Sequence, residues 1–275
     1  MFCSYNGVQR AEQLLVVSAL FLYCALSKNL VFLILRITDN EGEKPMKKGV
    51  IFDLDGTLLN TLDDLATAGN HVMKLNSREE YPVEAYKLMV GNGIPNLVRR
   101  LLAGTNAHTD PQVEAEAFAK VPEPLFEKAL AEFMAFYSEH SEDQTVPYEG
   151  IKEMLAHLQT AGVKMAVVSN KADGPVKQLV PKYFGPVISV ALGSRPGVPN
   201  KPDPASTLEA VQLLGLKNSE VLYVGDSNVD MITAKNAELE SCGVLWGFRD
   251  EKELRAAGAK HLAATAEELE KLIVE

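Results

Sequence analysis

The sequence predicts an α/β fold with a doubly wound, Rossmann-like parallel sheet and an inserted helical domain. Short apolar segments rich in β-branched residues alternate with helical patterns over most of residues 46–275. Such an alternation is typical of strands buried on both faces and of the helices that connect them. One stretch, residues 61–146, contains helical patterns only, which indicates a separate unit inserted into the sheet domain.

The expected strands are short apolar runs that end in polar turns. They cover Gly49–Phe52, Val163–Val168, Val187–Val190, Val221–Val224 and Cys242–Leu245. Helical patterns between them predict helices over Ile151–Ala161, Pro175–Tyr183, Pro204–Leu214 and Val229–Ala237. Because ligands of doubly wound sheets bind beyond the carboxyl ends of the strands, we expect a functional site in the turns that follow these strands.

The inserted stretch predicts helices and no convincing strand. The helices cover Leu62–Leu75, Val83–Val90, Ile94–Leu102, Pro111–Lys120 and Pro124–His140. The expected domains are therefore a core formed by residues 46–60 and 147–275 and a helical cap formed by residues 61–146. Since the insert follows the first strand, we expect it to lie above the carboxyl end of that strand and to cover a site there.

The composition limits which partners the protein can be expected to bind and in which compartment it can be expected to lie. The 275 residues include 27 basic and 37 acidic side chains, and the net charge of −10 disfavours nucleic acid and anionic membrane surfaces as partners. The cysteines are too few and too dispersed for a disulfide framework or a cysteine-based zinc site; they are Cys3, Cys24 and Cys242. The simplest location is a reducing compartment, the cytoplasm.

Residues 1–45 differ from the rest of the chain. Residues 14–35 are nearly all apolar and long enough to cross a bilayer, although Lys28 interrupts them. They could form a membrane anchor, or, as a less favoured alternative, Leu14–Leu26 could be the apolar part of a cleaved signal peptide. A third interpretation is an upstream extension from a wrongly assigned start, because Met46 leads directly into the first strand. Membrane contact is expected only if residues 14–35 are retained as an anchor.

Polar side chains gather at the predicted strand ends and before one helix. Asp53, Asp55, Gly56 and Thr57 follow the first strand, Ser169 and Asn170 follow the second, Lys201 precedes the helix at Pro204, and Asp226 and Asp230 follow the fourth strand. Each feature alone has a structural explanation, such as a helix cap, a turn or a solvated loop. Together, carboxylates that face one point repel each other unless a cation lies among them. Oxygen ligands of this kind suit Mg²⁺, which commonly holds a phosphate.

The order Asp-x-Asp-Gly-Thr, Ser after a strand, Lys-Pro and Gly-Asp-Ser-x-x-Asp resembles the haloacid dehalogenase (HAD) superfamily of phosphotransferases. The resemblance spans residues 46–250, and the insert resembles the C1 cap of that family. Residues 86–102 and 225–249 are most similar to the phosphoglycolate phosphatase branch. One departure is Asn60, where many members carry aspartate.

The resemblance implies a reaction role for several residues. Asp53 would be the nucleophile that forms an aspartyl-phosphate, and Asp55 would be the general acid and base. Lys201 would neutralise charge on the transferred phosphoryl group. Mg²⁺ would be held by the Asp53 side chain, the Asp55 backbone carbonyl and Asp226, while Asp230 would either reach the metal through water or orient Lys201.

The resemblance also implies contacts with the phosphate. Ser169 and the backbone N–H of Asn170 would hold phosphate oxygens, with Gly56 and Thr57 in the turn beside them. From the cap, a loop of small residues is expected to approach the substrate closely. This loop is Gly91, Asn92 and Gly93.

Several functions remain open at this point. The leading hypothesis is Mg²⁺-dependent hydrolysis of a small phosphorylated metabolite, with 2-phosphoglycolate as a candidate that would give glycolate and phosphate. A mutase of the β-phosphoglucomutase type would use the same groups, and a non-catalytic, membrane-anchored binding protein is a third alternative. Dehalogenation is disfavoured by Asp55, since a halide leaves without a proton. The sequence predicts no oligomeric state.

Overall fold

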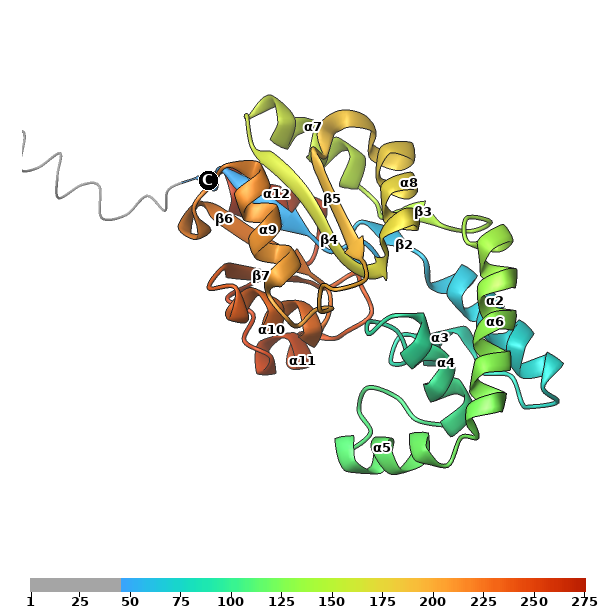
Figure 1. Cartoon of the computed structure of the whole chain (residues 1–275). Coiled ribbons are helices and arrows are strands. Elements are labelled where there is room, and N and C mark those ends of the chain that lie inside the picture. The colour runs from blue at the N-terminus through green and yellow to red at the C-terminus, as the bar shows by residue number, and fades with distance from the viewer. Residues whose placement is uncertain (1–45) are drawn as a thin grey trace, which may run out of the picture. The chain divides into compact units, whose positions relative to one another are not determined.

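A six-stranded, entirely parallel sheet is the centre of the computed structural model, which describes residues 46–275 (Figure 1). The strand order is β5-β4-β1-β6-β7-β8, so the first strand lies inside the sheet and the chain winds outward from it in both directions. The predicted doubly wound α/β fold is therefore confirmed. The strands are β1 (Gly49–Phe52), β4 (Lys164–Ala172), β5 (Val190–Ser194), β6 (Val221–Gly225), β7 (Glu240–Val244) and β8 (His261–Ala263).

Helices cover both faces of this sheet. One face packs against α7 (Ile151–Thr160), α8 (Asp173–Phe184) and α12 (Ala266–Val274), and the other packs against α9 (Ala205–Leu214) and α10 (Asn228–Asn236). The central strand β1 shows the two layers, because Val50 and Phe52 join the first hydrophobic cluster and Ile51 joins the second. All three side chains are fully buried, which explains why β1 is a continuous apolar run in the sequence.

Three strands have clearly other bounds than the sequence predicts. β7 covers Glu240–Val244 and so begins two residues before the predicted start at Cys242. β5 begins at Val190, where the predicted strand ends, because Gly185–Val187 forms a 3-10 turn after α8. β4 continues past Val168 to Ala172, and its pairing with β5 shifts between these two residues. Ser169, Asn170 and Lys171 therefore lie in an irregular strand end. The sequence analysis predicted no element after residue 245, where the structure has α11 (Glu251–Ala256), β8 and α12.

The three interpretations of residues 1–45 are a membrane anchor, a cleaved signal peptide and an upstream extension. They lie outside the described residues and stay predictions, as does membrane contact through residues 14–35. Within residues 46–275, no helix is both long and apolar enough to cross a membrane.

Between β2 (Leu59–Asn60) and β3 (Val146–Pro147) the chain is helical, as predicted. The helices are α2 (Leu62–Leu75), α3 (Val83–Tyr86), α4 (Ile94–Ala103), α5 (Pro111–Ala119) and α6 (Glu123–His140). The buried side chains of α2, α3, α4 and α6 form a hydrophobic cluster separate from the two at the sheet, and Phe248 of the sheet domain packs into it. This separate cluster supports the proposed cap of residues 61–146. α3 is shorter than the predicted helix, because Lys87, Leu88 and Met89 continue it only as turns, with N–H groups that donate to the carbonyl three residues earlier.

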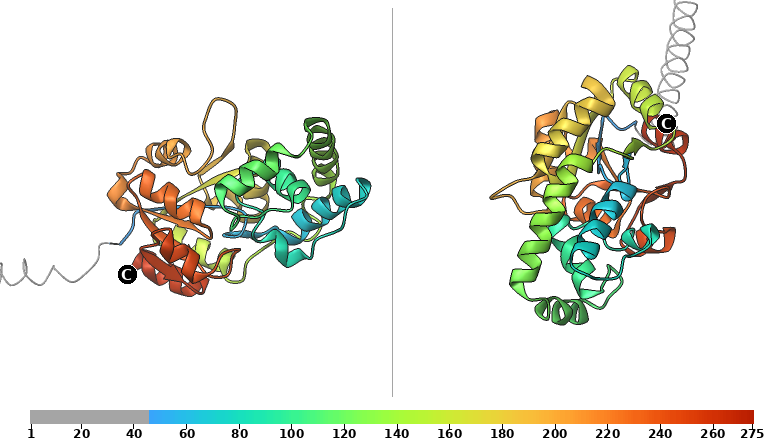
Figure 2. Two further views of the ribbon diagram at one scale, coloured as in Figure 1. Left: turned by 90° about the horizontal axis from the view of Figure 1, so that it is seen from below. Right: turned by 90° about the vertical axis from the view of Figure 1, so that its right-hand side faces the viewer.

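The helical unit lies at the carboxyl ends of the strands. In Figure 1 the arrowheads of β4 and β5 point toward it, and the left view of Figure 2 places it at one end of the sheet. β2 and β3 pair antiparallel where the chain leaves and re-enters the sheet domain. Beside them, the Asp64 carboxylate accepts hydrogen bonds from the Gln144 and Thr145 backbone N–H groups at 2.8–3.2 Å, which ties the two connections together.

Candidate active site

Three carboxylates meet at the carboxyl ends of β1 and β6. Asp53 follows β1 directly, while Asp226 follows β6 and Asp230 lies in the first turn of α10. One oxygen from each of the three lies within 4.8 Å of the others, and all three side chains are buried. The structure thus brings together the side chains that the sequence analysis placed at one edge of the sheet.

Lys201 reaches this group from the loop before α9. Its Nζ atom lies 2.9 Å from Asp53 Oδ1 and 2.7 Å from Asp230 Oδ1. The other Asp230 oxygen accepts hydrogen bonds from the Ser227 hydroxyl at 2.6 Å and from the Ser227 backbone N–H at 3.1 Å. With both oxygens engaged, Asp230 is better suited to orienting Lys201 than to binding a metal directly.

Asp226 is held from two sides. The Thr57 hydroxyl donates to Asp226 Oδ1 at 3.2 Å, and the Phe248 backbone N–H donates to Asp226 Oδ2 at 2.8 Å. Gly56 has φ = +87°, and a Cβ atom at this position would collide with the Asp226 carboxylate. Gly56 and Thr57, which were expected beside the phosphate, therefore lie against Asp226 and are not among the described residues that line the cavity.

Burial and mutual repulsion change the acidity of these carboxylates. Burial raises the pKa of Asp53 to about 7, although Lys201 opposes this shift, and Asp230 adds to it. Burial, together with the charges of Asp230 and Asp53, raises the pKa of Asp226 to about 8. Asp53 Oδ1 accepts no hydrogen bond of good geometry, even though the Lys201 ammonium lies at ion-pair distance. A divalent cation would stabilise the charged forms of both acids, so these residues fit a Mg²⁺ site.

Ser169 and Asn170 line the cavity at the irregular end of β4. The Asn170 side-chain amide donates to the carbonyls of Gly91 and Lys201 at 3.1 Å each and accepts from the Lys201 N–H at 2.8 Å. It therefore links the cap loop to the loop that carries Lys201. The Ser169 hydroxyl accepts the Lys171 N–H at 3.2 Å, so its own O–H can be donated to a phosphate oxygen.

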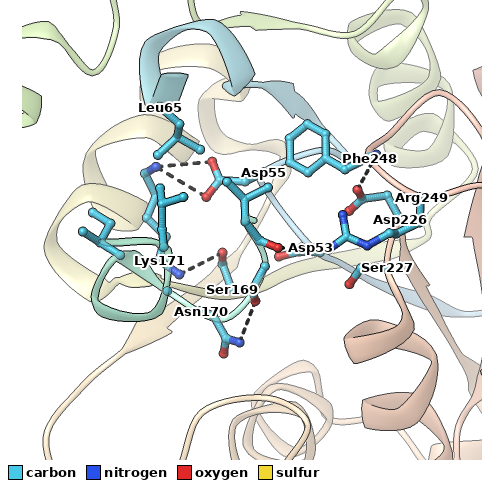
Figure 3. Close-up of a pocket in the computed structure, with 15 residues that line it drawn as sticks. Asp53, Asp55, Leu65, Ser169, Asn170, Lys171, Asp226, Ser227, Phe248 and Arg249 are labelled. Atoms are coloured by element: carbon cyan, nitrogen blue, oxygen red, sulfur yellow. Dashed lines mark hydrogen bonds and ion pairs between the residues drawn. The ribbon is translucent and has the colours of Figure 1, made fainter. Parts of the chain in front are cut away.

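Lys171 is a site residue that the sequence analysis did not single out. Its Nζ atom lies 3.3 and 3.4 Å from the two Asp55 carboxylate oxygens (Figure 3) and 2.9 Å from the hydroxyl of Tyr137 on α6. Burial by itself would lower the pKa of Lys171, but Asp55 and Tyr137 outweigh it and the pKa lies above its usual value. In the sequence, Lys171 is a single lysine after Ser-Asn, and only the position of the cap identifies its partner.

A cavity of about 60 Å³ opens between the strand ends and the cap (Figure 3). One wall is polar and is formed by Asp53, Asp55, Ser169, Asn170, Lys171 and Asp226. The cap wall is mainly apolar and is formed by Leu65, Val90, Ile94 and Leu97, while Phe248 lines the cavity from the sheet domain. From the predicted cap loop, Gly91 and Gly93 line the cavity, whereas Asn92 does not.

Arg249 links the cap segment just before this loop to the sheet domain, beside the cavity. Its guanidinium group donates to the carbonyl of Val90 at 3.0 Å and to that of Lys87, and it pairs with Glu253 at 3.2 Å. The segment that contains Arg249 contributed to the family resemblance, but no local pattern assigned this side chain a contact.

The comparisons with known proteins agree on one family. A model of the haloacid dehalogenase-like hydrolase family matches residues 50–244. A phosphoglycolate phosphatase from Pseudomonas putida is 37% identical over 200 residues, which cover 72% of this chain and 70% of the relative. One from Psychrobacter arcticus is 30% identical over 214 residues, which cover 76% and 88%.

A solved structure adds a likeness over the helical insert as well as the sheet. It comes from Lactobacillus delbrueckii subsp. bulgaricus and is provisionally described as a phosphoglycolate phosphatase. The TM-score is 0.77 and the sequence identity is 34%, and the match covers 84% of this chain and 99% of that one.

Proposed function

The chain belongs to the haloacid dehalogenase-like hydrolase family and is a phosphatase of that family, and we propose that it hydrolyses 2-phosphoglycolate through a phosphorylated Asp53. The observation that carries this proposal is the position of Asp53. It is buried, lies 2.9 Å from the Lys201 ammonium and lines a cavity that Asp55 also lines. A carboxylate beside a lysine and a second acid has the groups that covalent phosphoryl transfer needs.

In the first half of the reaction, an Asp53 oxygen attacks phosphorus, and the bond from phosphorus to the leaving oxygen breaks. Asp55 gives its proton to the leaving oxygen, so that an alcohol leaves rather than an alkoxide. Lys201 stabilises the negative charge on the phosphoryl oxygens, and Ser169 and the Asn170 N–H hold these oxygens in place.

In the second half, water attacks the phosphorus of the aspartyl-phosphate, and the bond from phosphorus to the Asp53 oxygen breaks. Asp55, which is now ionised, takes the proton from the attacking water. Inorganic phosphate leaves, and both carboxyl groups return to their starting states.

The residues that would hold Mg²⁺ are the Asp53 side chain, the Asp226 side chain and the Asp55 backbone carbonyl. When bound, Mg²⁺ supplies positive charge that allows an anionic carboxylate to approach an anionic phosphate. Asp230 orients Lys201 in this proposal, because its oxygens are engaged by Lys201 and Ser227.

The cavity and the relatives favour a small substrate. A volume of about 60 Å³ corresponds to about four to six water molecules, if each takes about 10–15 Å³. The mainly apolar cap wall offers few partners to the hydroxyl groups of a sugar. Curated relatives at 30% and 37% identity are named phosphoglycolate phosphatase. A two-carbon leaving group fits both observations.

A phosphate-release screen tests the proposal. The full chain is incubated with 2-phosphoglycolate, several sugar phosphates and an aryl phosphate, with Mg²⁺ or with chelator. We expect the highest kcat/KM for 2-phosphoglycolate, no activity in chelator, and recovery when Mg²⁺ is restored.

Three outcomes would contradict parts of the proposal. Full activity in a verified metal-free sample would show that the reaction needs no Mg²⁺. Interconversion of sugar phosphates without phosphate release would favour the mutase alternative. A lack of phosphate release from every substrate in the presence of Mg²⁺ would overturn the proposal as a whole.

A further inference from the structure

Lys171 carries a buried positive charge that the proposed reaction does not use. Its side chain is 4% exposed, and it lines the cavity beside Asp55. Burying an ammonium group is costly unless anions or hydrogen-bond acceptors surround it. Asp55 supplies one anion, and because Lys171 also lines the cavity, its charge is placed to meet a second anion on a ligand.

The protein partners of Lys171 leave part of its binding capacity open. An ammonium group has three N–H donors. Within residues 46–275, the Lys171 ammonium donates to the Tyr137 hydroxyl at 2.9 Å and to the two Asp55 oxygens at 3.3 and 3.4 Å. The two contacts to Asp55 are long and can share one N–H, which leaves another N–H for a ligand in the cavity.

The other cations near the cavity are engaged by the protein. The Lys201 ammonium lies 2.9 and 2.7 Å from two aspartate oxygens at the phosphate end of the site. Arg249 donates to the carbonyl groups of Lys87 and Val90, just before the cap loop, and pairs with Glu253. A second anionic group on the substrate would therefore meet Lys171 rather than either of these side chains.

The position of Lys171 beside Asp55 decides which part of the substrate it meets. Asp53 attacks phosphorus, and Asp55 must reach the leaving oxygen. Lys171 contacts the Asp55 carboxylate and lies on the side of Asp55 away from Asp226 (Figure 3). The atoms attached to the leaving oxygen therefore lie within reach of Lys171. In 2-phosphoglycolate, these atoms are one methylene group and a carboxylate.

We propose that Lys171 binds a carboxylate on the leaving group and thereby selects phosphomonoesters that carry an anion one carbon from the ester oxygen. This inference rests on the proposed function and names the group that separates 2-phosphoglycolate from neutral alkyl phosphates. The apolar cap side chains that line the cavity, among them Leu65 and Ile94, offer that anion no charge. Tyr137 holds the ammonium from α6, so the carboxylate site is complete only when the cap is in place.

Two substrates that differ mainly in charge isolate this carboxylate. 2-Phosphoglycolate and 2-phosphoglycolamide have nearly the same size and the same leaving oxygen. For the wild-type enzyme with Mg²⁺, we expect kcat/KM to be about 10- to 100-fold higher for the carboxylate, the range of a charge-assisted hydrogen bond in a buried site. Lys171→Met should remove most of this ratio. Comparing the ratio between variants cancels the intrinsic reactivity of the two esters.

Two further variants make the comparison specific. Lys171→Gln keeps a hydrogen-bond donor for Asp55 and Tyr137 without the charge, so it should fold even if the methionine variant does not, and it too should lose the preference. Lys164→Met is the matched control. Lys164 begins the same strand, and its ammonium donates to the Leu214 carbonyl at 2.6 Å, at the opposite end of β4. It should keep the wild-type ratio.

The outcomes that overturn the carboxylate site are distinct. If the Lys171 variants lose the same factor on both substrates, Lys171 only positions Asp55. A wild-type enzyme that hydrolyses both substrates equally, or a glutamine variant that keeps the preference, also overturns it while the phosphatase proposal stands. If the wild-type enzyme releases phosphate from neither substrate, the proposed function and the carboxylate site fail together.

Discussion

The sheet edge and the cap face meet at one cavity but present opposite surfaces to it. The sheet edge places three buried carboxylates and Lys201 within a few ångströms of one another. The cap face presents mainly apolar side chains, such as Leu65, Ile94 and Leu97. Most of the cap's polar links to the sheet domain here use backbone carbonyls, for example those of Gly91 and Val90. Tyr137, which holds Lys171, is the exception among the contacts described above.

This difference separates the chemistry from the choice of substrate. Charges that are held by strand ends and by each other keep one arrangement for every substrate. Apolar side chains and a loop can change the shape of the cavity without disturbing that arrangement. Substitutions of Asp53, Asp226 or Lys201 should therefore affect all substrates alike. Substitutions in the cap, or of Lys171, which the cap residue Tyr137 holds, should affect substrates differently.

The largest effect is expected from Asp53→Asn. An amide cannot form the aspartyl-phosphate, so phosphate release from every substrate should fall below detection. Asp63→Asn, a change in the first turn of α2, is the matched control and should keep full activity. Steady-state phosphate assays over several substrates measure both variants. Loss on one substrate only would break the division between the two surfaces.

Asp55→Asn should have the next largest effect, and it should depend on the leaving group. Hydrolysis of an alkyl phosphate should slow by about 10²–10⁴-fold, the range of general acid–base catalysis. An aryl phosphate with a good leaving group needs no proton in the first half, so Asp53 should still be phosphorylated and then stall. Rapid-quench experiments should show a burst of phenolate and a trapped phosphoenzyme. A folded variant with neither burst nor labelled Asp53 would contradict this role.

Much of the fold could be predicted because buried parallel strands have a characteristic composition. β1 and β6 are buried on both faces and are therefore unbroken apolar runs. β8 has three residues and pairs with β7 alone, so it lacks that composition. The predicted start of β5 was wrong because the apolar run around it includes a 3-10 turn, which the run alone cannot separate from a strand.

The site could be predicted only as far as the sheet topology determines it. Asp53 and Asp226 follow adjacent parallel strands, so the fold class alone brings them together. Lys171, Tyr137 and Arg249 depend on where the cap lies on the sheet, and sequence periodicity carries no information on that placement. These cap contacts are therefore the part of the site that only the structure supplies.

Gly93→Val tests the cap surface, with a smaller expected effect. Gly93 precedes α4 with φ = +82°, where a β-branched residue is strained by about 1–3 kcal/mol. The loop should shift and raise KM for the small substrate by roughly 5- to 30-fold, with less change in kcat. Gly104→Val is the matched control, because Gly104 has φ = +71° at the opposite end of the same helix. Equal KM changes in both variants would mean that the Gly91–Gly93 loop does not contact the substrate.

The smallest effect concerns the stability of the metal-free sheet edge. The pKa of Asp226 is about 8 in the folded protein, against 3.8 for an ordinary aspartate. Between these values, the folded protein holds a proton that the unfolded chain has released. The free energy of unfolding should therefore decrease as pH rises through this window. Asp226→Asn cannot release this proton and should lack that part of the decrease.

Urea midpoints of metal-free wild type and Asp226→Asn measure this difference between pH 5 and pH 8.5. The two midpoints should lie closest at pH 5, and the wild-type midpoint should fall relative to the variant as pH rises. Mg²⁺ stabilises the charged carboxylates, so it should reduce the wild-type decrease and affect the variant less. Parallel midpoints over the whole range would mean that Asp226 is already ionised without metal. Since the cap wall of the cavity is mainly apolar, a difference between the two proteins in how the urea midpoint changes with pH would come from the carboxylates at the sheet edge.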